Sequence, residues 1–189
     1  MNFKNFVFIF IFLFSCSNSS LYVDRVIDGD TFVLENGEKV RILGIDAPEK
    51  GEPFSDSATI FIEELILNKK VKLEYDLQKY DKYGRVLAYV FFDKKFLNEE
   101  ILKRGFAWVY IIPPNFKYFH RLKIAEEKAK KEKKGLWGKP YYVASKKGKK
   151  FHAFWCPSSK RIAEKNRIIF KSREEAIKRG YKPSGDCNP

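Results

Sequence analysis

Two carboxylates, Asp30 and Asp46, stand at places in the sequence where β-strands are expected to end. Asp30 closes an Asp-Gly-Asp turn at residues 28–30, and Asp46 follows a predicted strand over residues 39–43. Adjacent strands of a meander can bring such ends together, and paired carboxylates with backbone oxygens suit a hard cation. Either segment alone is also a common turn or loop. The pair is therefore a candidate cation site whose meaning depends on the residues around it.

Three more charged residues, Arg41, Glu49 and Arg85, lie in or beside the same predicted strands and turns. Glu49 lies three residues beyond Asp46. In isolation, Arg41 is an ordinary surface cation of a strand and Arg85 an ordinary cation of a turn. Like the carboxylate pair, these residues take their meaning from the segments that contain them.

Three segments, in order along the chain, resemble the active-site motifs of the staphylococcal nuclease (thermonuclease) family. They are residues 26–31 (VIDGDT), 41–49 (RILGIDAPE) and 81–85 (DKYGR). The likeness continues through Trp137 and so spans the domain that we predict at residues 21–138. The resemblance implies that Asp30 and Asp46 bind Ca²⁺ through their carboxylates. It also implies that Ala47 contributes its backbone carbonyl, for which no side chain is needed.

The same resemblance implies a reaction. Glu49 would orient or deprotonate the attacking water, since its place three residues beyond Asp46 keeps it beside the metal without using it as a ligand. Arg41 and Arg85 would stabilise the transition state, because a phosphodiester gains a second negative charge during water attack and planar guanidinium groups bind that charge bidentately, better than Lys does. The P–O5′ bond would break. The expected activity is a Ca²⁺-dependent endonuclease that hydrolyses DNA and RNA to 3′-phosphorylated products. The alternative is a catalytically inactive OB-fold protein that binds nucleic acid. The segment after Glu49 is short and lacks the mobile, lysine-bearing loop of the type enzyme, which is a departure from the family pattern.

Four residues are candidates for contacts with the bound nucleotide. By resemblance, Lys82, Tyr83 and Tyr110 match family positions near the nucleotide. Trp108 stands where the type member has a tyrosine, and aromatic stacking tolerates that change. Residues 106–110 also alternate between interior and surface like a strand, so Trp108 and Tyr110 are equally consistent with a place in the core.

The elements that position these residues predict a mainly β, α+β fold. We expect a five-stranded OB-type β-barrel with about three helices, closed so that no strand edge is exposed, plus a small C-terminal appendage. The predicted elements are strands 21–27, 31–35 and 39–43, a helix from Ser55 or Asp56 through Ile66, strands 71–77 and 85–92, and helices 98–104 and 116–134. Ser55 or Asp56 is the expected cap of the first helix, and Asn98 that of the second. The inner stripe of the third consists of Phe119, Leu122, Ala125 and Ala129.

Residues 1–15 have the features of a signal peptide. The apolar run 6–14 is too short to cross a bilayer as a permanent helix but suits the hydrophobic region of a signal. It ends in Leu-Phe-Ser-Cys, which resembles a bacterial lipoprotein box with Cys16 as the acylated residue and 16–20 as a linker. The alternative is an ordinary cleaved signal peptide. We therefore expect an exported monomer that is anchored to a membrane through Cys16, in the periplasm or at the cell surface, or is secreted.

The formal net charge of +13 is concentrated outside the predicted thermonuclease-like domain at 21–138. That domain holds 22 Lys and Arg residues against 20 Asp and Glu, whereas residues 139–189 hold 14 against 4. The tail is therefore the better candidate for non-specific attraction to phosphate. A solvated basic surface near a membrane, or a tail that binds another polyanion, is the alternative. We expect a basic linker at 139–150 and a small module at 151–189.

The small module resembles domains related to Ada-type metal-binding domains. In that module Ser184 is usually a cysteine, so only His152, Cys156 and Cys187 remain as soft ligands, one short of a tetrahedral zinc site. If the first cysteine of the chain is acylated, two are left in an oxidising compartment, where a disulfide is the simpler outcome. A zinc site and free thiols are the alternatives to the disulfide, in that order.

Overall fold

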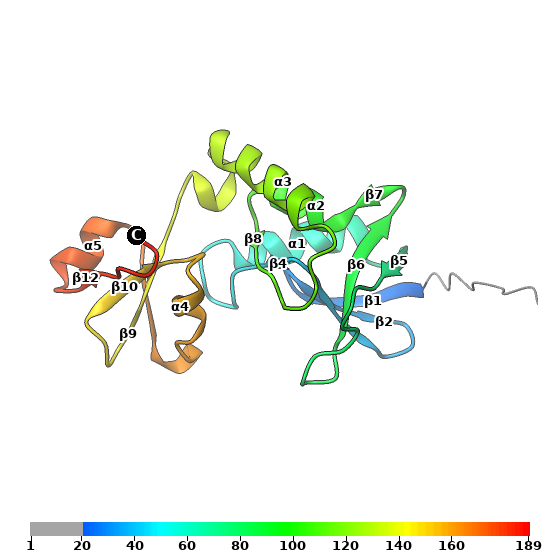
Figure 1. Ribbon diagram of the computed structural model, residues 1–189, viewed down its shortest axis with the longest axis horizontal. Coiled ribbons are helices and arrows are strands. Elements are labelled where there is room, and N and C mark those ends of the chain that lie inside the picture. The colour runs from blue at the N-terminus through cyan, green and yellow to red at the C-terminus, as the bar shows by residue number, and fades with distance from the viewer. Residues whose placement is uncertain (1–20) are drawn as a thin grey trace, which may run out of the picture.

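This computed structural model describes residues 21–189, so the signal peptide and the acylation predicted at Cys16 lie outside the described part of the chain. Two units lie next to each other in Figure 1. The first is a β-barrel with its helices, and the second is a smaller sheet with short helices formed by the C-terminal residues. Within residues 21–189, no helix has the length and apolar character needed to cross a membrane.

The first unit is a closed barrel with both parallel and antiparallel strand pairs. Its strands are β1 (Leu21–Asp28), β2 (Thr31–Leu34), β3 (Lys39–Ile42), β5 (Lys70–Glu74) and β6 (Val86–Phe92), with β7 (Lys95–Phe96) as a short extension. Strands β1, β2 and β3 form an antiparallel meander, and β5 pairs with both β1 and β6. A parallel pairing of β3 with β6 closes the barrel. The predicted five-stranded OB-type barrel is confirmed.

Three α-helices cover the barrel. They are α1 (Ser55–Ile66), α2 (Leu97–Arg104) and α3 (Phe119–Lys131), followed by the 3-10 turn η1 (Gly135–Trp137). Each helix buries an apolar side chain, namely Ile62, Ile101 and Leu122. These side chains share one core with the strand residues Phe32 and Ala88. Burial of a large aliphatic or aromatic side chain contributes roughly 1.5–3 kcal/mol, so this shared core holds helices and strands together.

Two helix ends differ from the predicted ones. The residue before α1 is Phe54, in the left-handed conformation at φ 69°, and it makes no side-chain cap, so the cap expected at Ser55 or Asp56 is wrong. Helix α3 is shorter than the predicted 116–134. Phe119 is its first residue and is 41% exposed, so it lies outside the inner stripe to which it was assigned.

Asn98 lies inside α2 and is not its cap. Its side chain is fully buried, accepts a hydrogen bond from Val90 N (3.0 Å) and donates one to Leu43 O (2.6 Å). Buried backbone groups need such partners, and here one amide satisfies two of them. Asn98 therefore ties β6 to the turn that leads from β3 toward Asp46.

A short strand pair extends from the barrel toward the second unit. It consists of β4 (Ile45–Asp46) and β8 (Trp108–Val109), which run antiparallel. The turn at 28–30 approaches this region closely. A Cβ on Gly29 would lie 2.6 Å from Cβ of Ala58 and 2.7 Å from Cβ of Ala47. The approach requires a glycine at this position.

The second unit is a four-stranded sheet in the order β11-β9-β10-β12. Its elements are β9 (Tyr142–Ser145), β10 (Lys150–Ala153), α4 (Pro157–Lys160), η2 (Glu164–Asn166), β11 (Arg167–Phe170), α5 (Arg173–Lys178) and β12 (Lys182–Pro183). Because β9 pairs with both β10 and β11, the segment 139–150 is not a linker. Most of its lysines lie in the turn before β10. Their number gave the segment the composition of a linker, although Val143 and Ala144 are buried strand residues. We call residues 141–189 the C-terminal module.

Candidate active site

Asp30, Arg41 and Asp46 meet at one end of the barrel. Asp30 ends the turn between β1 and β2, Arg41 lies in β3 opposite Thr31, and Asp46 is the last residue of β4. Arg41 Nη2 lies 3.1 Å from Asp30 Oδ2 and 3.0 Å from Asp46 Oδ1. The three side chains are nearly buried. The structure thus places both carboxylates on one guanidinium, as the predicted meander suggests.

The guanidinium of Arg41 is held on its other side by the backbone. Its Nη1 donates to Ile42 O (2.7 Å) and to Ile45 O (2.9 Å). Burial would lower the pKa of Arg41, but the negative charges of Asp30 and Asp46 raise it above its usual value. Arg41 is therefore a fixed positive charge that positions the two carboxylates.

Asp30 has hydrogen-bond donors on both oxygens. Its Oδ1 accepts from Thr31 Oγ1 (2.9 Å) and its Oδ2 from Ala47 N (3.0 Å). Burial would raise the pKa of Asp30, but Arg41 and the Ala47 N–H lower it. The neighbouring Asp28 differs, because burial and the charge of Asp30 raise its pKa to about 7. The turn therefore holds one firmly ionised carboxylate and one that binds a proton more readily.

A residue that no motif predicts, Lys160 at the end of α4, brings a second positive charge into the site. Its Nζ lies 2.9 Å from Asp46 Oδ2, 3.3 Å from Glu49 Oε1 and 3.4 Å from Ala47 O. The ammonium also lies over the ring of Trp108, 4.9 Å from its centroid. Burial would lower the pKa of Lys160, but Asp46 and Glu49 raise it. Lys160 is one of many lysines in the basic tail, and nothing in its sequence context distinguishes it.

Asp46 has the less satisfied of the two carboxylates. Among residues 21–189, no donor reaches its buried Oδ2 in good hydrogen-bond geometry, although Lys160 Nζ lies close to it. Burial raises the pKa of Asp46 to about 6, against the opposing charges of Lys160 and Arg41. This oxygen, the Ala47 carbonyl and the Glu49 carboxylate all face one cationic group. Carboxylate and carbonyl oxygens are the ligands that Ca²⁺ prefers, so the residues fit the cation that the family resemblance implies.

The loop that carries Glu49 is tied to the C-terminal module through Glu52. Glu49 N donates to Glu52 Oε2 (3.0 Å), which also accepts from Tyr141 OH (2.8 Å). The other oxygen, Glu52 Oε1, forms a buried ion pair with Arg167 Nη1 at 2.8 Å. The position of Glu49 beside the carboxylates therefore depends partly on the module.

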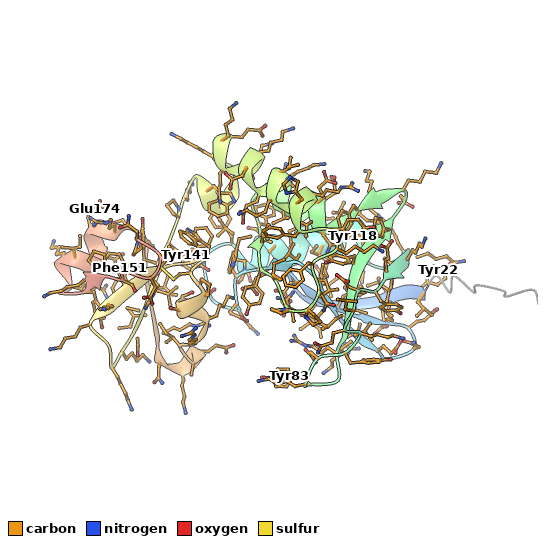
Figure 2. The ribbon with its side chains drawn as sticks, in the orientation of Figure 1. Tyr22, Tyr83, Tyr118, Tyr141, Phe151 and Glu174 are labelled. Carbon is orange, nitrogen blue, oxygen red and sulfur yellow. A yellow bond between two sulfur atoms is a disulfide. The ribbon has the colours of Figure 1, made fainter. Side chains whose placement is uncertain are left out.

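Arg85 lies on an exposed turn with two of the predicted nucleotide-binding residues. Its Nε pairs with Asp81 Oδ2 at 2.7 Å, and its side chain is 30% exposed. Its guanidinium carbon lies 5.6 Å from the ring centroid of Tyr83, and Lys82 Nζ lies 5.0 Å from the same centroid. Figure 2 shows Tyr83 at the tip of its loop, and the residue is 73% exposed. These three side chains form an open cationic and aromatic surface, not part of the buried cluster.

Trp108 and Tyr110 lie in different surroundings from that turn. The ring of Trp108 is 1% exposed and meets Phe154 of the module edge to face, with 5.3 Å between centroids. In this arrangement Trp108 cannot stack on a base. The structure therefore supports the interpretation of Trp108 as a core residue. Tyr110 is partly exposed, and its backbone N–H donates to Gly44 O (3.1 Å).

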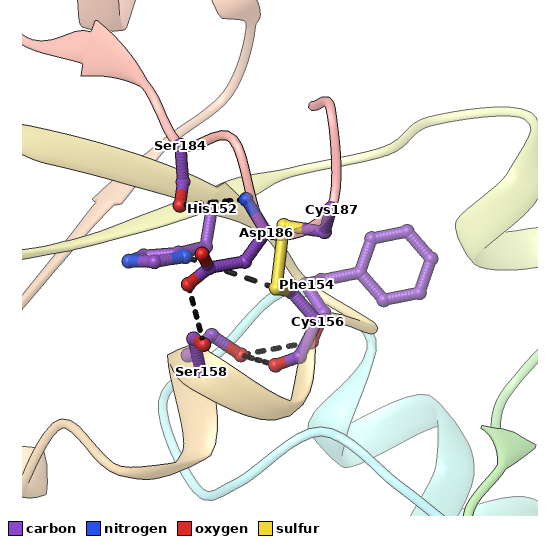
Figure 3. Close-up of a disulfide and its surroundings, with 8 residues drawn as sticks. His152, Phe154, Cys156, Ser158, Ser184, Asp186 and Cys187 are labelled. Atoms are coloured by element: carbon purple, nitrogen blue, oxygen red, sulfur yellow. Dashed lines mark hydrogen bonds between the residues drawn. A yellow bond between two sulfur atoms is a disulfide. The ribbon is translucent and has the colours of Figure 1, made fainter.

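The cysteines and the histidine that the sequence offers as soft ligands lie together in the C-terminal module, where the two cysteines form a disulfide. Cys156 and Cys187 are bonded, and His152 Nδ1 lies 3.8 Å from Cys156 Sγ (Figure 3). Ser184, where the related module has a cysteine, accepts a hydrogen bond from Asp186 N. Of the arrangements that the sequence leaves open, this structure contains the disulfide. The ligand atoms of His152 and the two cysteines nevertheless converge within 4.8 Å of one another.

Comparison with known proteins agrees with this geometry. A family model described as staphylococcal nuclease homologue matches residues 39–139, more than half of the chain. The chain belongs to the staphylococcal nuclease family. A thermonuclease of Staphylococcus hyicus is 40% identical over 133 residues, 65% of this chain and 79% of that protein. The endonuclease YncB of Bacillus subtilis is 41% identical over 135 residues, 66% of this chain and 64% of its own length.

The extent of the staphylococcal nuclease match separates two parts of the site. It includes Arg41, Asp46, Glu49 and Arg85, which lie in the barrel unit. It ends at residue 139, before the module that carries Lys160. The match therefore covers Asp46, Glu49 and both arginines, but it covers neither Asp30, which precedes its first residue, nor the lysine beside the site.

Proposed function

We propose that this protein is an exported, Ca²⁺-dependent endonuclease that hydrolyses DNA and RNA to 3′-phosphorylated products. The observation that supports the proposal most directly is the buried pair of carboxylates on Arg41, in which Asp46 Oδ2 lacks a hydrogen-bond donor in good geometry among the described residues. Glu49 lies beside this pair, because its Oε1 and Asp46 Oδ2 both face Lys160 Nζ. Membership in a family with nucleases named among its members gives the activity class.

The cation site would be built from Asp30, Asp46 and the carbonyl of Ala47. Bound Ca²⁺ would supply positive charge to an oxygen of the scissile phosphate. The protein prepares the site in advance, since Arg41 fixes Asp30 and Asp46 through one nitrogen and so keeps two buried negative charges in place. Preorganised charge of this kind needs no rearrangement during the reaction.

Glu49 is the residue placed to handle the proton of the attacking water. Its side chain is 39% exposed, so water reaches it, and its backbone is fixed by Glu52. As the water oxygen bonds to phosphorus, its proton passes to the Glu49 carboxylate. The P–O5′ bond breaks, the 5′ oxygen takes a proton from a solvent water and leaves as a hydroxyl, and the phosphate stays on the 3′ side.

Arg85 is the arginine with free donors. Among residues 21–189 its Nε has Asp81 as acceptor, and no acceptor is found for its two Nη groups. Those groups can bind the phosphate oxygens as charge grows on them. Lys82 and Tyr83 on the same turn would contact the adjacent backbone and a stacked base. A strand of nucleic acid would thus run from the exposed turn to the buried carboxylates.

Export and anchoring belong to the same proposal. The apolar run at 6–14 and the sequence Leu-Phe-Ser-Cys support a signal peptide with acylation at Cys16. The disulfide of the module suits an oxidising compartment outside the cytoplasm. Metabolic labelling with a fatty acid would show incorporation that Cys16→Ser abolishes, and equal labelling of the variant would contradict the anchor.

The activity is tested by digesting single-stranded DNA, duplex DNA and RNA with the purified protein in excess Ca²⁺ or in chelator. We expect cleavage only with Ca²⁺, and losses of roughly 10²-fold or more in Glu49→Gln and Arg85→Ala. Glu38→Gln is the matched control, because Glu38 is exposed on a turn. Equal activity in the wild type and both site variants would defeat the site. Binding of nucleic acid with no cleavage would favour the inactive OB-fold protein.

A further inference from the structure

The C-terminal module places one ammonium group among the acceptors of the proposed cation site. Lys160 Nζ contacts Asp46 Oδ2, the Ala47 carbonyl and the Glu49 carboxylate at 2.9, 3.4 and 3.3 Å. Asp46 and the Ala47 carbonyl belong to the proposed Ca²⁺ site, and Glu49 is the proposed base. A single cation cannot share this position with Lys160.

Charge balance explains why the ammonium is stable there. Asp30, Asp46 and Glu49 bring three negative charges to a region where Arg41 supplies one positive charge. Burial of unpaired carboxylates is costly, and the positive charge of Lys160 beside Asp46 and Glu49 lowers that cost. The side chain of Lys160 is 18% exposed and lies against the face of Trp108, which further stabilises a cation.

The module that carries Lys160 is docked on the barrel by specific contacts. Phe154 packs against both Trp108 and Trp137, with centroid distances of 5.3 and 5.1 Å. The buried pair of Arg167 with Glu52 fixes the module to the Glu49 loop at 2.8 Å. In Figure 1, α4 lies on the side of the module that faces the barrel. Lys160 is therefore held at the site by a folded unit, not by a free tail.

We propose that the C-terminal module is an internal inhibitor of the nuclease, and that its Lys160 occupies the cation site until Ca²⁺ displaces it. The inference rests on the proposed Ca²⁺ site and adds to it a competitor within the same chain. A divalent cation bonded to the same oxygens gains more from three negative charges than a monovalent ammonium does. The protein would thus be closed at low Ca²⁺ and opened by the cation.

Calorimetric titration of the purified protein with Ca²⁺, without nucleic acid, tests the competition. If Lys160 fills the site in about nine of ten molecules, Lys160→Met is expected to bind Ca²⁺ about tenfold more tightly than the wild type. Lys165→Met is the control, because Lys165 is an exposed lysine of the same module. Wild-type and Lys160→Met affinities within twofold of each other overturn the inference and leave the Ca²⁺ site intact. Absence of binding in every protein overturns the site itself and the inference with it.

Lysine labelling of the wild type separates displacement from simple repulsion between nearby charges. Acetic anhydride labelling read by mass spectrometry is expected to modify Lys160 several-fold faster in saturating Ca²⁺ than in chelator, because the displaced ammonium becomes accessible. The rate at Lys165 is expected to stay unchanged. Equal protection of Lys160 with and without bound Ca²⁺ shows that it does not leave and overturns the proposal. A loss of turnover in Lys160→Met with unchanged Ca²⁺ affinity likewise overturns it, and makes Lys160 a substrate contact.

Discussion

Replacement of Arg41 by methionine is expected to destabilise the fold, whereas the same replacement at Arg85 is not. Arg41→Met removes a guanidinium that contacts two carboxylates and two carbonyl oxygens from a side chain that is only 7% exposed. Arg85→Met removes one ion pair, with Asp81, from a side chain that is 30% exposed. Both variants should lose nuclease activity, so stability is the property that distinguishes the two arginines.

The magnitude follows from what Arg41 leaves behind. Loss of one partner from a buried ion pair costs about 3–5 kcal/mol, and the two carboxylates that Arg41 holds expose only 11% and 9% of their side chains. For a chain of 150–250 residues, 1 kcal/mol corresponds to roughly 2–4 °C in Tm, so a fall of roughly 6–20 °C is expected. An exposed or half-exposed pair such as that of Arg85 contributes about 1 kcal/mol or less.

The pH dependence gives this prediction an internal check. Burial already raises the pKa of Asp46 to about 6 in the wild type, and removal of Arg41 raises it further. Protonation of Asp46 relieves the unpaired charge. The loss of unfolding free energy in Arg41→Met is therefore largest above the raised pKa that Asp46 has in this variant, and it shrinks as the pH falls below that value. We therefore expect a smaller difference from the wild type at pH about 5 than at pH about 8.

The measurement is urea unfolding followed by circular dichroism, in chelator so that bound cation does not contribute. Wild type, Arg41→Met and Arg85→Met are compared at both pH values. The account of Arg41 as a buried, positioning charge is refuted if Arg41→Met unfolds within about 1 kcal/mol of the wild type at the higher pH. It is refuted equally if Arg85→Met costs as much as Arg41→Met.

Two further outcomes are expected. Burial and the charge of Asp30 raise the pKa of Asp28 to about 7, so the folded protein holds a proton there that the unfolded chain has already lost. Relative to Asp28→Asn, the wild type in chelator should therefore lose stability as the pH rises from about 4 to about 7. An equal difference in the free energy of urea unfolding between the two proteins at pH about 4 and about 8 would contradict this. Reduction of the Cys156–Cys187 disulfide, which spans 31 residues, should remove about 3–4 kcal/mol from the module. Hydrogen exchange should then quicken at β9 and β10 and stay slow at β6, and unchanged protection of β9 would show that the disulfide does not stabilise the module.

Local pattern was sufficient to predict the barrel and most of its site. The alternation of apolar residues and the turn signals predicted the strands, since pleated strands and tight turns depend on neighbouring residues. The order of three motifs then predicted which carboxylates and arginines form the site. Asp30, Arg41 and Asp46 do meet, whereas Arg85 pairs with Asp81 on an exposed turn. Asn98 escaped correct prediction because its partners, Leu43 and Val90, are distant or lie on another element.

Only the tertiary structure decided what surrounds that site. β9 appeared to be a linker because its flanking lysines outweigh its two buried residues in composition, and its strand pairing is set by β10 and β11. The burial of Trp108 depends on Phe154, a residue of a different unit. Lys160 reaches Ala47 across 113 residues of sequence. Such contacts follow from the docking of two folded units, which leaves no periodicity or spacing in the chain from which they could be inferred.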